Sequence, residues 1–179
     1  FLSRPSSPAL PPLLALTHSH EPRPPPRHRP SVKQIRAAID EVCDAQWFVL
    51  GPNVTALEEE LAAYTGAKHA IGCGSGSDAI LLALMALDIG CNGGHNGRVL
   101  CPSYTFFATG GAISRVGLTP VYCDIDPVTY NMCPEHAATL AEQCDNLVAI
   151  MPVHLYGQAA DMDAFLELGE RYGVPVIED

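Results

Sequence analysis

Residues 71–80 read Ile-Gly-Cys-Gly-Ser-Gly-Ser-Asp-Ala-Ile, an apolar segment that breaks into glycines and serines and then enters a leucine-rich run. This order predicts a strand, a turn and the first turn of a helix. Glycine lets the backbone approach an anion closely, and the unpaired N–H groups at a helix start favour negative charge. The stretch therefore predicts a phosphate-binding turn between a strand and a helix.

Short apolar runs alternate with helical patterns along the rest of the chain. We expect strands at 67–73, 98–102, 119–124, 147–153 and 174–178, and helices at 77–88, 105–115, 134–143 and 161–172. This alternation predicts an α/β fold, with a mostly parallel sheet that carries helices on both faces. Ligands of such sheets bind beyond the carboxyl ends of the strands, where the glycine-serine turn and Asp179 would both lie.

Two further helices are predicted before the turn. Apolar residues recur at helical spacing after Ser31, which is a candidate N-cap. A second helix would begin near Asn53 or Thr55, with Thr55 and Glu58 spaced as a capping box, and Gly66 would end it.

The first thirty residues differ in composition from the rest. Residues 1–30 hold nine of the sixteen prolines, which predicts a disordered Pro/Arg/His-rich extension before a folded domain at 31–179. The formal net charge is −10, and six of the ten Lys and Arg residues lie in the first 36 positions. The acidic remainder argues against nucleic acid or an anionic membrane as a partner.

The composition, 47% hydrophobic and 17% charged over 179 residues, is typical of a soluble globular protein. The seven cysteines form no CxxC pair, which favours reduced thiols and a cytoplasmic protein. The spacing of Cys91, His95 and Cys101 fits no zinc pattern, so no metal site is expected. Because the chain opens on Phe1 and closes on Asp179 directly after an apolar run, we expect a fragment of a longer protein.

The glycine run allows two interpretations. Residues 71–76 resemble the glycine-rich loop with which class I methyltransferases bind S-adenosylmethionine. Those enzymes place an acid before the first glycine and another at the end of the next strand. Here Ala70 and Ile71 precede Gly72, and the next predicted strand ends near Pro102. A methyltransferase is therefore the alternative interpretation.

A second resemblance extends much further along the chain. Residues 46–179 resemble the DegT/DnrJ/EryC1/StrS family of pyridoxal-phosphate aminotransferases, which act largely on nucleotide-linked keto sugars. The matching blocks are, in order, FVLGPNVTALEEELAAYTGAKHAIGCGSGSDAILLALMALDIG, CPSYTFFATGGAI, PVYCDIDPVTYNM, MPVHLYGQAADMDA and VPVIED. The resemblance implies part of a fold-type I large domain, a homodimer with active sites at the interface, and a lysine that holds the cofactor as a Schiff base. The sequence contains only Lys33 and Lys68, and neither occupies the expected position.

The resemblance also assigns roles at the phosphate and ring of the cofactor. Gly76 and Ser77 would bind the phosphate through backbone N–H groups and the Ser77 hydroxyl. Phe106 would stack on the pyridine ring, with Tyr104 and Phe107 as the alternatives.

Two further residues are expected near the reacting edge. Asp179 would be the catalytic carboxylate that keeps the ring nitrogen protonated, because a buried carboxylate stabilises the pyridinium cation. His154 would reach the cofactor or the substrate. Glu178 should point away from Asp179 because side chains alternate along a strand. Asp124 and Asp126 are expected in a turn with Pro127 rather than at a metal.

The complete enzyme would transfer an amino group, with glutamate as the expected donor, to a nucleotide-linked keto sugar. Without the Schiff-base lysine, this chain alone is predicted to be inactive. A methyltransferase and a folded fragment that only associates with a partner remain as alternatives. The sequence leaves open the sugar, the nucleotide, and a dehydratase branch of the family. It also departs from the family at 91–98, where a glycine-rich loop replaces a tight turn.

Overall fold

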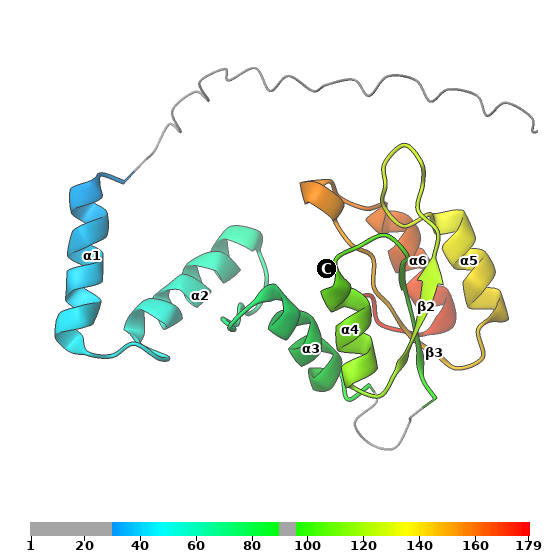
Figure 1. Ribbon diagram of the computed structural model, residues 1–179, viewed down its shortest axis with the longest axis horizontal. Coiled ribbons are helices and arrows are strands. Elements are labelled where there is room, and N and C mark those ends of the chain that lie inside the picture. Colours follow the sequence, from blue (N-terminus) through cyan, green and yellow to red (C-terminus); the bar gives the residue numbers. More distant parts are fainter. Residues whose placement is uncertain (1–29, 90–95) are drawn as a thin grey trace, which may run out of the picture. The chain divides into compact units, whose positions relative to one another are not determined.

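The computed structural model describes residues 30–89 and 96–179 (Figure 1). Two sequence predictions lie outside this range, namely disorder in residues 1–29 and the loop that contains Cys91 and His95. The chain divides into two compact units, Phe1–Leu57 and Glu58–Asp179. The second unit contains the sheet and all of the predicted site residues.

The first unit contains α1 (Val32–Ala45). The Ser31 hydroxyl accepts a hydrogen bond from the Gln34 N–H at 3.2 Å, and the Gln34 side chain accepts one from the Ser31 N–H at 2.7 Å. The predicted N-cap at Ser31 is thus confirmed, and this helix has a capping box.

Helix α2 (Pro52–Thr65) crosses the boundary between the units. The prediction that Asn53 or Thr55 caps it is wrong, because the helix begins at Pro52. Proline suits a first helical position, where its missing N–H would have no partner. The predicted end at Gly66 is confirmed, with φ at +72° in the left-handed region that glycine tolerates.

The sheet has three parallel strands in the order β2-β1-β3: β1 (Arg98–Pro102), β2 (Thr119–Cys123) and β3 (Leu147–Ile150). The helices are α3 (Gly76–Ala86), α4 (Phe107–Arg115), α5 (Pro134–Gln143) and α6 (Met162–Tyr172), with a short 3₁₀ turn at Leu155–Gly157. The predicted α/β architecture is confirmed. None of the helices in the described part of the chain is long and apolar enough to cross a bilayer.

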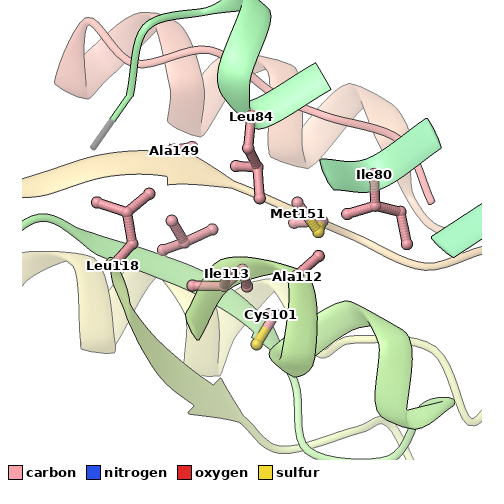
Figure 2. Close-up of a cluster of buried hydrophobic side chains, with 9 residues drawn as sticks. Ile80, Leu84, Cys101, Ala112, Ile113, Leu118, Ala149 and Met151 are labelled. Carbon is pink, nitrogen blue, oxygen red and sulfur yellow. The ribbon is translucent and has the colours of Figure 1, made fainter. Parts of the chain in front are cut away.

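Alternation along the strands divides the core into two layers. Val99 and Cys101 face α3 and α4, whereas Leu100 faces α5 and α6. Figure 2 shows the first layer, in which Ile80 and Leu84 of α3 point into the cluster. Helices therefore cover both faces of the sheet, as the apolar strands predicted (Figure 1).

The segment predicted as a strand at 174–178 runs parallel to the continuation of β3, although only Val176 forms a recognised bridge. Ile177 and Asp179 donate backbone hydrogen bonds to Ile150 and Pro152 at 2.9 and 3.0 Å. The ladder is interrupted at Pro152, which has no N–H to donate, and resumes where the His154 N–H donates to the Asp179 carbonyl. On the side of β1, β3 ends at Ile150 rather than at the predicted 153 because Pro102 of β1 has no N–H to donate to Met151.

The predicted strand at 67–73 is wrong. These residues are irregular, and no strand in the described residues pairs with them. The Gly72 N–H instead donates to the Glu58 carboxylate at 2.6 Å, and Ile71 is 83% exposed. An apolar run forms a strand only where a neighbouring strand pairs with its backbone N–H and C=O groups. Composition alone therefore predicted a strand that does not form here.

The cysteines give a first test of this core. Cys101 and Cys123 are buried, and loss of solvation raises the pKa of each thiol to about 12, whereas Cys43 and Cys73 are exposed. At pH 8 a pKa of about 12 leaves about one thiol in ten thousand as the reactive thiolate. We expect maleimide to modify Cys43 and Cys73 in the native chain and to reach the buried pair only in urea, as measured by peptide mass spectrometry. Rapid native labelling of Cys101 would contradict the packing described above.

Candidate functional site

A cavity of about 380 Å³ lies where the parallel strands end. It is lined by Gly76, Ser77, Ile80, Thr105, Phe106, Ala108, Thr109, Val153, His154, Leu155, Tyr156 and Asp179. The segments that follow β1 and β3 both contribute. After β1 the chain passes through α4 to β2 on one side, whereas after β3 it passes through α6 to residues 174–179 on the other side. This is the topological switch point at which open α/β sheets bind ligands. All five residues selected from the sequence line this one cavity.

One end of the cavity is the start of α3. Ser75 is the N-cap, and its hydroxyl accepts a hydrogen bond from the Asp78 N–H at 3.1 Å. The first backbone bond of the helix comes from Ala79, so the N–H groups of Gly76 and Ser77 have no acceptor among residues 30–89 and 96–179. A Cβ built on Gly76 would meet no atom within 4 Å, which means that the space beside this backbone is open. The arrangement suits a phosphate.

Asp78 takes no part in lining this end. Its side chain accepts a hydrogen bond from the Ser75 hydroxyl at 2.9 Å, which holds the carboxylate against the N-cap. A negative charge here favours the helix start without being among the groups that line the cavity.

Asp179 lies at another part of the wall. Its Oδ2 accepts a hydrogen bond from the Thr109 hydroxyl at 2.6 Å, and Thr109 is only 1% exposed. Its backbone is held on both sides, because its N–H donates to Pro152 at 3.0 Å and its carbonyl accepts from the His154 N–H at 2.8 Å. The carboxylate is therefore fixed through the backbone bonds to the segment that follows β3 and through the side-chain bond from α4.

His154 lines the cavity with both ring nitrogens already engaged. Nδ1 accepts a hydrogen bond from the Ala160 N–H at 3.0 Å, so Nδ1 carries no proton. Nε2 then carries the proton and donates it to the Glu178 carboxylate at 2.9 Å. Glu178 does not line the cavity, as strand alternation predicted. The imidazole can therefore contact a ligand through its ring face, while its nitrogens link two loops.

Two aromatic residues, Phe106 and Tyr156, line the cavity. Phe106, at the N-cap position of α4, lines the cavity and is 76% exposed, whereas Tyr104 and Phe107 do not line it. Of the three aromatic candidates, Phe106 is the one that the structure brings to the cavity. Tyr156, a lining residue, has φ at +55°, a strained conformation for a bulky side chain. Its hydroxyl lies 3.2 Å from that of Tyr104, and this hydrogen bond raises the pKa of Tyr104 above its usual value.

Sequence reasoning missed Thr105, Thr109 and Tyr156. Thr109 lies in the first turn of α4 and Thr105 just before its N-cap, and their hydroxyl oxygens lie 3.0 Å apart. Two threonines at this spacing after an apolar strand could have signalled a polar wall. Tyr156 has a left-handed backbone conformation, which the sequence pattern does not predict.

The remaining polar predictions lie away from the cavity. The N–H groups of Thr129 and Val128 donate to the Asp126 carboxylate at 2.7 and 2.9 Å, and these bonds hold the pKa of Asp126 below its usual value. The predicted turn at Pro127 is thus confirmed. Within the described ranges, no group of three or more His, Cys, Asp or Glu side chains is arranged to hold a metal ion.

The cavity thus combines an anion-binding helix start, an exposed aromatic ring and a fixed carboxylate. A flat heterocycle with a phosphate arm and a protonatable nitrogen needs these three features. The donor set fits pyridoxal phosphate, and the match rests on the open space at Gly76 and on the carboxylate of Asp179.

Comparisons with known proteins agree with this fit. The DegT/DnrJ/EryC1/StrS aminotransferase family matches residues 31–179. The chain is 48% identical over 146 residues to a pleiotropic regulatory protein of Geobacillus stearothermophilus, covering 82% of this chain and 38% of that protein. It is 42% identical over 146 residues to the UDP-2-acetamido-2-deoxy-3-oxo-D-glucuronate aminotransferase of Pseudomonas aeruginosa, covering 82% of this chain and 39% of that protein.

Solved structures agree with the sequence comparison. A crystal structure of NtdA from Bacillus subtilis with bound PMP matches with a TM-score of 0.74 and 32% identity, covering 82% of this chain and 32% of that one. The chain spans less than two fifths of the length of the curated relatives named above. These matches favour the aminotransferase over the methyltransferase interpretation of the glycine run. The chain belongs to the DegT/DnrJ/EryC1/StrS aminotransferase family.

Proposed function

We propose that this chain forms the cofactor-binding part of a pyridoxal-phosphate-dependent aminotransferase that acts on a nucleotide-linked keto sugar, with glutamate as amino donor. The single observation that carries the proposal is that Gly76, Ser77, Phe106 and Asp179 line one cavity. They come from three separate stretches of sequence, and each supplies a different feature that the cofactor requires. Relatives that act on nucleotide sugars support the substrate class.

In the proposed site the N–H groups of Gly76 and Ser77 bind the phosphate, and Phe106 stacks on the ring. Asp179 holds a proton on the ring nitrogen through its negative charge. When bound, pyridoxal phosphate supplies an electron sink for the transfer of the amino group. The protein residues orient this group and keep its ring nitrogen cationic.

Among the described residues that line the cavity there is no lysine that could hold the cofactor covalently. The two lysines of the chain are Lys33 and Lys68, and neither lines the cavity. We therefore propose that the 179 residues bind the cofactor without a covalent bond and do not turn over substrate. A homodimer, implied by the family resemblance, stays a prediction for the longer protein.

Ligand titration tests the function. We expect pyridoxamine phosphate to bind saturably, because it needs no lysine, and pyridoxamine without its phosphate to bind at least tenfold more weakly, since the helix start would have no anion to hold (~1.4 kcal/mol). Fluorescence of the pyridine ring measures both. S-adenosylmethionine is the comparison ligand.

Three outcomes would contradict the proposal. Saturable binding of S-adenosylmethionine with none of pyridoxamine phosphate would favour the methyltransferase. Binding of neither ligand would leave a chain that only associates with a partner. Transfer of an amino group from glutamate by the 179 residues alone would contradict the predicted lack of turnover.

A further inference from the structure

We propose that Thr109 is a positioning residue, which holds the Asp179 carboxylate with its free oxygen available to the cavity, and that Thr105 in turn orients Thr109. The inference rests on the proposed function, because it assigns these residues to the ring-nitrogen end of that site. Thr109 lies in the first turn of α4, and Thr105 directly precedes Phe106, the N-cap of that helix.

The direction of the hydrogen bonds follows from the number of protons. A carboxylate can only accept, so the single Thr109 hydroxyl proton is used on Asp179 Oδ2 at 2.6 Å. This length is typical of a hydroxyl bonded to an ionised carboxylate. The Thr105 and Thr109 hydroxyl oxygens lie 3.0 Å apart, and because the Thr109 proton is already used, Thr105 must be the donor. The bonds run in one direction, from Thr105 to Thr109 to Asp179.

Burial holds these two consecutive hydrogen bonds in place. Thr109 is 1% exposed and Thr105 is half-buried, so water does not replace either bond readily. Threonine also restricts rotation about its first side-chain bond, because it is β-branched. With Oδ2 held, Oδ1 has no hydrogen-bond partner among the residues that the structure describes. The carboxylate therefore offers one fixed oxygen to the cavity that it lines.

The consequence for the site is specific. A carboxylate that can rotate, or that turns towards water, stabilises a cation less than one held in place. Loss of the Thr109 hydroxyl should leave the phosphate end intact and weaken the bond to the ring nitrogen. The bound ring should then carry its proton for a smaller fraction of the time.

The test compares three variants in the full 179-residue chain. Thr109→Val keeps the side-chain shape and removes the hydroxyl, Thr109→Ser restores the hydroxyl, and Thr105→Val removes only the first bond. The probe is pyridoxamine phosphate labelled with ¹⁵N in its ring, which reports affinity and, through its chemical shift, the protonation of the ring nitrogen. Thr139→Val is the control, because that hydroxyl, at an exposed position of α5, bonds only to the Glu135 carbonyl.

For Thr109→Val we expect about tenfold weaker binding (~1.4 kcal/mol) and a ¹⁵N shift towards the neutral ring. Thr109→Ser should recover most of both effects, and Thr105→Val should show a smaller change in the same sense. Thr139→Val should match the parent chain. If Thr109→Val fails to fold, the Ser and Thr105→Val variants decide the outcome.

The failure of this inference differs from the failure of the proposed function. If the parent chain does not bind the probe, the proposed function is wrong. If the parent binds it and Thr109→Val, or Thr105→Val where the former does not fold, gives an unchanged affinity and an unchanged ring shift, Thr109 has only a structural role. Weaker binding by Thr109→Ser equal to that of Thr109→Val would also overturn the inference.

Discussion

Phe165→Ala is expected to lower the free energy of unfolding of this chain by about 3–5 kcal/mol. Phe165 lies on α6, is fully buried, and packs in the layer between α5, α6 and the sheet. Its removal takes away apolar contacts and leaves a cavity that the surrounding strands cannot fill. Because a domain of this size is stable by only about 5–15 kcal/mol, the loss should be visible as a large shift in the urea midpoint.

The adjacent residue provides a matched control. Leu166 is 49% exposed on the same helix, so Leu166→Ala should change the stability by less than about 1 kcal/mol. Far-UV circular dichroism is the suitable probe, because the single tryptophan, Trp47, belongs to the other compact unit. Equal midpoints for the two variants would mean that α6 does not pack on the sheet as described.

The elements whose bounds were predicted most accurately are those that the local sequence specifies. The strand at 98–102 and the helix at 134–143 have the predicted bounds, because a buried apolar run and a proline at the first helical position leave few alternatives. The expected position of Gly76 and Ser77 at a helix start also holds, since Ser75 is a strong N-cap.

The errors arose where a distant part of the chain decides the conformation. Residues 67–73 have the composition of a strand and no partner strand in the described residues. Residues 174–179 do follow β3, and a single proline on the neighbouring segment interrupts the regular pairing. Neither outcome can be read from the segment itself, because backbone pairing depends on both strands.

The same reason explains what the sequence could and could not predict of the candidate site. Asp179 was selectable because it lies at the carboxyl end of an apolar strand, where the family resemblance implies an acid, and Phe106 because the resemblance implies an aromatic ring after the next strand. Thr109 is separated from Asp179 by 70 positions, and its hydrogen bond appears only once α4 packs beside the sheet. Residues that touch a ligand can be proposed from motifs, whereas those that hold them in place need a structure.

Asp179→Asn should have the largest effect on the proposed site. We expect pyridoxamine phosphate to bind about ten- to a hundredfold more weakly, the cost of replacing a charged hydrogen-bond partner with a neutral one (about 1.5–3 kcal/mol). The variant is informative because the asparagine oxygen can still accept the Thr109 hydroxyl proton, so packing is kept while the negative charge is lost.

The ring nitrogen should lose its proton together with the charge, since an amide does not stabilise a pyridinium cation. Titration of the ¹⁵N-labelled probe measures both the affinity and this protonation, and Asp163→Asn, at an exposed carboxylate in the first turn of α6, makes the same chemical change away from the cavity. If Asp179→Asn and Asp163→Asn bind the probe equally well and with the same ring shift, the carboxylate does not face the ring nitrogen. The cavity would then bind this cofactor, if at all, through its phosphate and the Phe106 ring alone.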